Sequence, residues 1–350
     1  MLYSKHCVLW LLLAFLNLWC QAFEPVTLTA AAAAAISGIG VSLGWWKRDF
    51  LMGITFCRLN ECCRKPYLKA NVEELRLLLK NHLYGQHIVQ DVLVNAIGAH
   101  FDNIESSRKP LVMSFHGTSG VGKTYVSRFI ASSMYEKGDS SRFVHRFAGR
   151  IPFTTNSLVE AYKINLQKTV LESLRECPMS LFIFDEVEEM PPGILNVIVH
   201  MLDHHVSQVD GVDFSKAIFI FITNLGGTEI SKHLENILTN HRIREQTDIY
   251  DFESILQSSA YNYENTGFFR SHIIDTYVVD YYIPFLPLEE SHVKSCILHE
   301  FSRYNITQQQ VDDTVIRSVL KHLSADGRFI TGGCKRITKK IEAVVRKHFS

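Results

Sequence analysis

Residues Phe115 to Phe129 read FHGTSGVGKTYVSRF. Within this stretch, Gly117 to Thr124 match the phosphate-loop pattern G-x-x-x-x-G-K-[ST] at every fixed position. The apolar run LVMSFH precedes the loop and the helix-like run YVSRFIASSMY follows it, which is the strand, loop and helix context that such a loop requires. Glycines let backbone N–H groups approach phosphate oxygens, and the start of the following helix adds partial positive charge. The stretch therefore predicts a nucleotide-binding α/β domain rather than a glycine-rich turn of no function.

Three apolar runs of strand length place this loop in a sheet: Leu111 to His116, Leu181 to Phe184, and Ala217 to Thr223. Helical patterns lie between them, notably Leu158 to Arg175 and Gly193 to His204. Near-continuous apolar strands separated by helices predict a parallel sheet covered on both faces, in a three-layer α/β domain. In such sheets the ligand lies at the carboxyl ends of the strands.

Polar residues follow each predicted strand, where they suit nucleotide chemistry. Lys123 is placed to reach the β- and γ-phosphates of a nucleotide, and Thr124 to supply its hydroxyl to Mg2+. Asp185 and Glu186 follow the second run, where one carboxylate can hold Mg2+ through water while its neighbour polarises the attacking water. Asn224 follows the third run and can orient the same water, although asparagine after a strand is also a common turn residue.

Helical patterns dominate the rest of the chain. Asn71 can cap a helix with Glu74 at its third position, ahead of the first strand. Beyond Pro287, patterns over Glu289 to Tyr304, Gln308 to Leu323 and Gly333 to Phe349 predict a small helical domain. We therefore expect a nucleotide-binding domain over 67–287 and a helical lid domain over 288–350, preceded by a cysteine-rich linker over 48–66.

The N-terminal residues resemble an export signal. Lys5 precedes an apolar run from Cys7 to Leu16, and Ala22 is small enough for signal peptidase. We expect residues 1–22 to be a cleaved signal peptide; an uncleaved anchor is the alternative, but Asn17 interrupts a run already short for a membrane span.

A second uncharged segment follows within residues 23–47. Val26 to Trp46 is long enough to span a bilayer but rich in alanine, glycine, serine and threonine, which contribute little transfer energy. We expect a shallow attachment to the membrane surface, with Trp45 and Trp46 at the interface. A buried helix or a flexible linker is the alternative.

Six cysteines remain after the predicted signal: Cys57, Cys62, Cys63, Cys177, Cys296 and Cys334. An even number in an exported chain permits disulfides, but the sequence does not choose their pairing. Zinc is the competing interpretation of the first three, and adjacent cysteines without a C-x-x-C partner make a poor tetrahedral set. Asn305 begins the N-glycosylation sequon Asn-Ile-Thr.

The overall charge indicates no nucleic-acid partner. Lys plus Arg and Asp plus Glu number 36 each, and 47% of the residues are hydrophobic. A chain with this share of hydrophobic residues is not disordered, and its balanced charge gives no argument for a nucleic-acid partner.

Taken together, these residues resemble the torsin family of AAA+ ATPases, which is related to the Clp ATPases. The resemblance runs over nearly the whole chain and includes LYGQH, the phosphate loop, FIFDE, KAIFIFITN, GFFRSHIID, PFLPL and the terminal GGCK. It implies an ATP- and Mg2+-dependent ATPase of the endoplasmic reticulum lumen and nuclear envelope, with chaperone-like work on partner proteins.

The resemblance assigns roles to particular positions. It implies Walker A for Gly117, Thr118, Ser119, Gly120, Val121, Gly122, Lys123 and Thr124, Walker B for Asp185 and Glu186, sensor 1 for Asn224 and sensor 2 for Lys335. Cys296 and Cys334 match a pair that torsins can join by a disulfide, and since Cys334 adjoins Lys335, oxidation is expected to move the residue that senses nucleotide. Cys57, Cys62, Cys63 and Cys177 also match family cysteines, so bridging among them is expected.

Two positions bear on activity. Torsins often carry asparagine where this chain has Thr124, which is the usual Mg2+ ligand. In related unfoldases an arginine near the segment equivalent to Ser271 to Asp275 reaches the neighbouring subunit's γ-phosphate, and SHIID contains none. Because an arginine finger contributes about 10³ to 10⁵ in rate, the chain alone should hydrolyse ATP poorly.

The resemblance supplies a partner, the lumenal domain of a membrane-bound activator of the lamina-associated-polypeptide type, which donates the arginine. It also allows a homo-oligomer. The rival function is a nucleotide-gated assembly module whose slow hydrolysis only resets binding. A secreted protein with a vestigial phosphate loop is disfavoured, because every Walker and sensor residue is present.

Overall fold

The structure is a computed structural model, and it describes residues 60–149, 156–203, 208–209, 211–264, 266–269 and 271–348. The chain divides into two compact units, Met1–Cys62 and Cys63–Ser350, and every helix and strand given below belongs to the second. The predicted signal peptide, the uncharged segment that follows it and Cys57 lie outside the described residues. None of the helices within the described ranges has both the length and the apolar character needed to cross a membrane.

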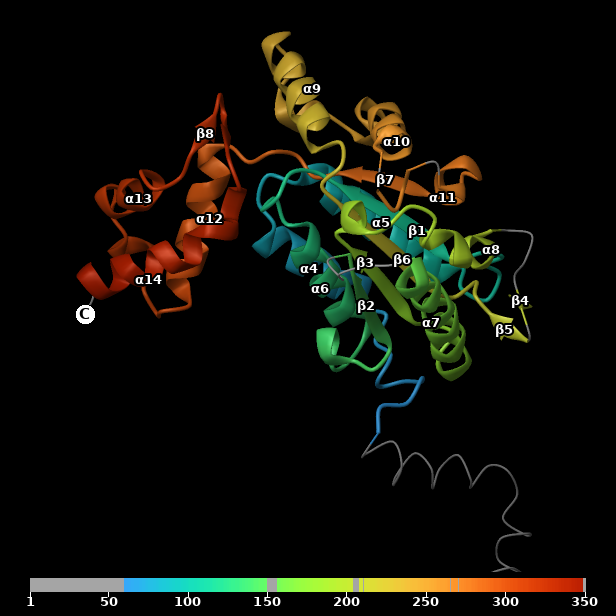
Figure 1. The fold of residues 1–350 in the computed structure, drawn as a ribbon. Coiled ribbons are helices and arrows are strands. Elements are labelled where there is room, and N and C mark those ends of the chain that lie inside the picture. The colour runs from blue at the N-terminus through green and yellow to red at the C-terminus, as the bar shows by residue number, and fades with distance from the viewer. Residues whose placement is uncertain are drawn as a thin grey trace, which may run out of the picture. The chain divides into compact units, whose positions relative to one another are not determined.

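A five-stranded parallel sheet forms the centre of the second unit, with strand order β2-β3-β6-β1-β7 (Figure 1). Its strands are β1 Leu111–His116, β2 Val144–Ala148, β3 Leu181–Asp185, β6 Ile218–Thr223 and β7 Tyr281–Pro284. The last residue of β1 lies opposite the last residue of β6, His116 against Thr223, and Asp185 lies opposite Ile222. The carboxyl ends of the three central strands therefore meet at one edge, as the sequence predicts.

The central and edge strands differ in how visible they are in the sequence. Every residue of β1 and β6 is buried, because helices cover both faces of the sheet. The edge strand β2 reads VHRFA and is only partly buried, while β7 is four residues long and ends at Pro284. Short or half-exposed edge strands carry little apolar signal, so the sequence predicts the three central strands and misses these two.

The two faces of the sheet pack against different helices. On one face, Met113, Ile183 and Ile220 share a core with α4 Val72–His82, α5 His87–Asp102 and α6 Lys123–Met134. On the other, Val112, Phe182 and Phe219 share a core with α7 Asn156–Glu176, α8 Val199–Leu202, α9 Gly227–Thr239, α10 Glu253–Asn262 and α11 His272–Asp275. The three-layer arrangement is therefore confirmed. The helix predicted over Gly193 to His204 is wrong in part, because that stretch forms the 3-10 turn Leu195–Ile198 followed by the single turn of α8.

Helices also dominate the C-terminal residues. They are α12 Glu290–Ser302, α13 Asp313–Leu320 and α14 Ile337–His348, preceded by the 3-10 turn Gly333–Arg336. The sequence predicts these helices but not the small hairpin of β8 Ala325–Asp326 and β9 Phe329–Ile330 that separates α13 from the turn. A second small hairpin pairs β4 Gln208–Val209 with β5 Val212–Asp213.

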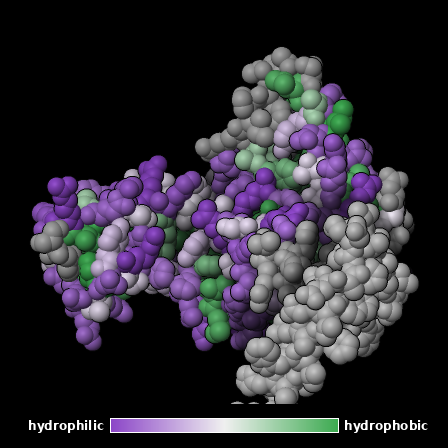
Figure 2. All heavy atoms as spheres, turned by 90° about the horizontal axis from the view of Figure 1, so that it is seen from below, coloured by the Kyte–Doolittle hydropathy of each residue, from purple (hydrophilic) through white to green (hydrophobic). Residues whose placement is uncertain are grey.

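The described part of the face drawn in Figure 2 is mostly hydrophilic, with hydrophobic side chains in small separate groups. The sequence pattern agrees with this, since the large apolar residues are concentrated in the central strands and in the inner faces of the helices.

Asn71 caps α4 as predicted, with its side-chain oxygen accepting a hydrogen bond of 3.0 Å from the backbone N–H of Glu74.

Candidate nucleotide site

The phosphate loop joins the end of β1 to the start of α6, in the context that the sequence predicts. Gly117, Gly120 and Gly122 all have positive φ angles, at 149°, 87° and 110°. A Cβ atom at Gly120 would lie 1.9 Å from the carbonyl oxygen of Gly332, so the C-terminal segment can approach the loop only because this residue is glycine. The loop conformation therefore depends on its glycines for both backbone angle and close packing.

A cavity of about 850 Å³ opens beside this loop. It is lined by the predicted residues Ser119, Gly120, Val121, Gly122, Lys123, Thr124, Asp185, Glu186, Asn224, Cys296, Cys334 and Lys335. Gly117 and Thr118 are not part of the lining, but both of their carbonyl oxygens accept hydrogen bonds from the Lys123 ammonium. The fold thus gathers the predicted phosphate-loop, Walker B and sensor residues around one space large enough for a nucleotide.

Lys123 is the buried cation of the site. Besides its two bonds to loop carbonyls, its Nζ donates a hydrogen bond of 2.9 Å to Oδ1 of Asn224. The pKa of Lys123 is lowered to about 8, chiefly by burial and in smaller part by Lys335, while the carboxylates of Glu188 and Asp185 oppose the shift. The ammonium is therefore held close to the pH at which it would lose its charge.

Thr124 and Asp185 lie together as a Mg2+ site requires. The Thr124 hydroxyl donates a hydrogen bond of 3.0 Å to Oδ2 of Asp185, and Oδ1 of Asp185 accepts from the backbone N–H of Glu186. A hydroxyl oxygen and a carboxylate oxygen side by side are the hard donors that Mg2+ prefers. Glu186 has a φ of 57°, in the left-handed region, which turns the chain sharply at the end of β3.

Glu188 is a site residue that the sequence alone does not indicate. Its Oε1 accepts a hydrogen bond from the Nδ2 of Asn224, and its buried Oε2 has no hydrogen-bond partner among the residues that the structure describes. The two ends of the Asn224 amide are thereby distinguished, with Nδ2 toward the Glu188 carboxylate and Oδ1 toward the Lys123 ammonium. The signal in the sequence is a third carboxylate two residues after Glu186, but a 3-10 turn is needed to bring it back into the cavity.

The C-terminal helices contribute the opposite wall. Lys335 belongs to the 3-10 turn Gly333–Arg336, and the preceding backbone N–H, of Cys334, donates a hydrogen bond of 3.1 Å to the carbonyl oxygen of Gly120. Cys334 also forms a disulfide with Cys296 of α12. The turn that carries Lys335, the disulfide and the phosphate loop are therefore in direct contact.

Aromatic side chains line another part of the cavity, and the sequence gives no local signal for them. They are His82 and Tyr84 at the end of α4, Tyr125 on α6 and His299 on α12. The rings of His82 and His299 have centroids 4.9 Å apart, and burial followed by the charge of His299 lowers the pKa of His82. Flat aromatic and imidazole rings provide surfaces on which a nucleotide base can stack.

The remaining predicted residues lie away from the cavity. Cys63 forms a disulfide with Cys177, across a sequence separation of 114 residues, and Cys62 is also disulfide-bonded. Because Cys62 and Cys63 are both in disulfides, neither is available as a thiolate ligand for zinc. Asn305 is exposed, at a φ of 58°, in the connection that follows α12.

Comparisons with known proteins agree with this site. The sequence model of the Torsin family matches residues 57–184. A torsin-like protein of Drosophila melanogaster is 37% identical over 338 residues, covering 95% of this chain and 96% of its own. A torsin-like protein of Caenorhabditis elegans is 36% identical over 316 residues, covering 88% of this chain and 86% of its own.

Two solved structures show a similar fold. The S. cerevisiae Hsp104–ADP complex superposes with a TM-score of 0.55 at 18% identity over 85% of this chain. Hsp104 in its closed state with ATPγS and FITC casein gives a TM-score of 0.51 at 16% identity over 91% of this chain. This chain spans half the length of each of those chains.

The parallel sheet with its phosphate loop and the carboxylates at the end of β3, together with the torsin-like relatives, identify an AAA+ ATPase. The two torsin-like relatives are aligned with almost the entire chain at identities well above those of the Hsp104 structures. The chain belongs to the torsin family.

Proposed function

We propose that this protein is an ATP-hydrolysing member of its family in the endoplasmic reticulum lumen and the nuclear envelope, where it remodels partner proteins as a chaperone does. In this proposal Val26 to Trp46 attaches the chain to the membrane surface. The lumenal domain of a membrane protein of the lamina-associated-polypeptide type completes hydrolysis by donating an arginine.

The described side chains suit binding and hydrolysis of ATP. Lys123 and the loop N–H groups bind the phosphates, and Thr124 and Asp185 hold Mg2+, which when bound neutralises phosphate charge. Glu186 polarises the attacking water and Asn224 orients it. Lys335 senses the γ-phosphate from the lid side of the cavity, where it is exposed.

Two arginines among the described residues line the cavity, and their contacts support the proposal that a partner protein supplies the catalytic arginine. Arg128 lies 3.8 Å from a carboxylate oxygen of Asp139, and Arg303 lies 3.0 Å from one of Glu300. Each therefore already lies beside an acidic side chain, which Arg128 shares with Arg146. Since SHIID contains no arginine, a second copy of the chain does not provide one from that segment either.

The test is steady-state ATP hydrolysis by the purified protein, alone and with the lumenal domain of the activator. We expect stimulation of about 10³-fold or more, lost in Glu186→Gln and lost when the activator's arginine is removed. Glu186→Gln should still bind ATP, which separates loss of chemistry from loss of folding. Binding through Lys123 without any stimulation would instead favour the nucleotide-gated assembly module.

Two features of the described residues support a lumenal location. The disulfides Cys63–Cys177 and Cys296–Cys334 are of a kind that persists in oxidising compartments, and the Asn305 sequon is exposed. In cells, treatment with a glycosidase should increase the gel mobility of the protein, and Asn305→Gln should show no such shift. Identical mobility before and after treatment of the unaltered protein would count against glycosylation in the lumen.

A further inference from the structure

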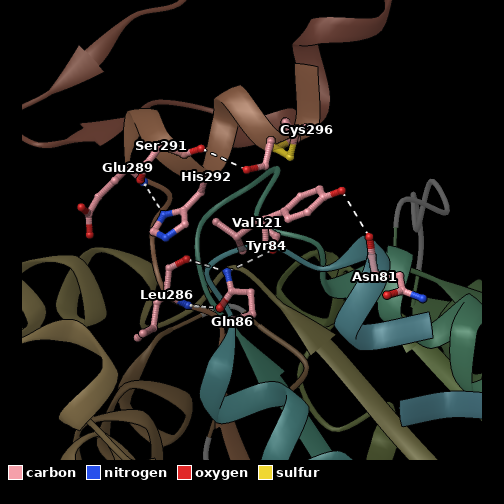
Figure 3. The surroundings of a disulfide bond; sticks show 11 residues. Asn81, Tyr84, Gln86, Val121, Leu286, Glu289, Ser291, His292 and Cys296 are labelled. Carbon is pink, nitrogen blue, oxygen red and sulfur yellow. Dashed lines mark hydrogen bonds between the residues drawn. A yellow bond between two sulfur atoms is a disulfide. The ribbon is translucent and has the colours of Figure 1, made fainter. Parts of the chain in front are cut away.

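A buried glutamine connects the phosphate loop to the segment that leads into the lid helices. Gln86 precedes α5 and is 1% exposed. Its Nε2 donates hydrogen bonds to the carbonyl oxygens of Val121, at 3.2 Å, and Leu286, at 2.8 Å, while its Oε1 accepts one of 2.9 Å from the N–H of Leu286 (Figure 3). Although Tyr84 lines the cavity, Gln86 does not, so it would not touch a bound nucleotide itself.

The bond to Val121 bears on the direction of a phosphate-binding N–H group. In a planar trans peptide, the C=O of one residue and the N–H of the next point in opposite directions. The peptide between Val121 and Gly122 is trans, since the cis peptide among the described residues is Lys65–Pro66. Because the Val121 carbonyl points toward the Gln86 side chain, the Gly122 N–H points to the opposite side of the peptide. Gly122 lines the cavity at the start of α6, where N–H groups attract anions.

The preceding peptide of the loop is held in the same manner. The Gly120 carbonyl accepts from the N–H of Cys334, so two successive loop carbonyls are bound by donors outside the loop. Leu286 in turn lies between the end of β7 and the start of α12. A single amide therefore joins the phosphate loop to the connection through which the lid is attached.

We propose that Gln86 is a positioning residue for nucleotide binding. It sets the orientation of the Val121–Gly122 peptide, and thereby the N–H that binds phosphate, and it ties that peptide to the connection at Leu286. The ligand class is the phosphate chain of a nucleoside di- or triphosphate. This role concerns nucleotide binding by the chain alone, so its test is independent of the activator and of the cellular location.

The chain contains a matched control on the same helix. Gln90 lies one turn after Gln86, and its Nε2 donates to two carbonyl oxygens as well, those of Leu79 at 3.2 Å and Leu83 at 2.8 Å. Gln90 therefore bridges α4 to α5, and neither of these two hydrogen bonds involves the phosphate loop. Methionine has a similar length but no amide, so Gln86→Met and Gln90→Met remove the same chemistry from two places.

The experiment measures the Kd of ADP and of adenosine for the full chain and both variants, together with the free energy of unfolding without nucleotide. For Gln86→Met we expect the Kd of ADP to rise about tenfold, the loss of one hydrogen bond to a charged group, while that of adenosine stays within about twofold. Any effect of Gln90→Met should fall on ADP and adenosine alike. Equal weakening of both ligands in Gln86→Met, or an ADP-selective effect of Gln90→Met, would overturn the proposal.

A second variant covers the case in which Gln86→Met does not fold. Gln86→Glu keeps the shape and the acceptor for the Leu286 N–H, but its ionised carboxylate has no donor for the carbonyl oxygens of Val121 and Leu286. Protonation at lower pH restores one donor, so the ratio of its ADP Kd to that of the unaltered chain should fall as the pH is lowered. A ratio that does not change with pH contradicts the role.

Discussion

At the scale of single residues, the charge of Lys123 is balanced by its surroundings. Burial favours the neutral amine and lowers the pKa to about 8, while Glu188 is the largest influence in the opposite direction. The same carboxylate orients the Asn224 amide that bonds to Lys123. Glu188 therefore acts on the phosphate-binding cation both through its field and through a hydrogen-bonded neighbour.

This balance predicts a pH dependence of nucleotide affinity. Phosphate binds the ammonium form, so the ADP affinity of the chain should be constant well below pH 8 and fall above it, approaching about tenfold per pH unit. Glu188→Gln keeps an acceptor for Asn224 but removes the negative charge, which lowers the pKa of Lys123 further and moves the fall to lower pH. Measuring the Kd of ADP for both proteins at several pH values below and above 8 gives the shift of the profile.

The neighbouring residue provides the control for this prediction. Glu189 lies next in sequence, is exposed, and does not line the cavity. Glu189→Gln should leave the pH profile where it is. If both variants moved the profile equally, a general change in surface charge would explain it, and the assignment of Glu188 would be wrong.

At the scale of elements, the phosphate loop is held between the start of α5 and the C-terminal turn that precedes α14. Gln86 binds it from the start of α5, and the turn Gly333–Arg336 binds it from the C-terminal side. That turn is in turn fixed to α12 by the disulfide Cys296–Cys334. We expect reduction of the disulfide to release the turn from α12 and to weaken its hold on the Gly120 carbonyl.

We therefore expect reductant to lower the ADP affinity of the unaltered chain by roughly 1 kcal/mol, or about fivefold, the net contribution of one hydrogen bond. In Cys296→Ser, which leaves the Cys334 backbone in place, the affinity should be the same with and without reductant. The paired change Cys63→Ala with Cys177→Ala should keep the response, because that disulfide is remote from the cavity lining. If reductant still lowered the ADP affinity of Cys296→Ser, the disulfide would not be the cause of the effect.

At the scale of the whole molecule, the disulfide Cys63–Cys177 ties the beginning of the second unit to the end of α7. It closes a longer segment than Cys296–Cys334, with sequence separations of 114 and 38 residues. In the chain-entropy description, a crosslink over a longer segment removes more freedom from the unfolded chain.

Cys63→Ala combined with Cys177→Ala should lower the free energy of unfolding by about 2–4 kcal/mol. Urea unfolding monitored by circular dichroism measures the change. The corresponding double change of Cys296 and Cys334 should cost less. An equal or larger loss for the shorter segment would show that native packing, not the unfolded chain, determines the effect.

The sequence by itself determines the features that consist of contiguous residues. The phosphate loop, the three apolar strands with Asp185, Glu186 and Asn224 after them, and the Asn71 cap are all visible because a local pattern dictates local structure. Because parallel strands share one edge, even the gathering of these polar groups follows from the pattern.

Only the tertiary structure decides the contacts that join distant segments. Gln86 meets Leu286 across 200 residues, Asn224 meets Glu188, and the rings of His82 and His299 pair from different parts of the fold. The pairing of Cys63 with Cys177 belongs to the same class. Hydrogen bonds, ring contacts and disulfides of this kind depend on how helices and strands pack, and no local periodicity encodes the choice of partner.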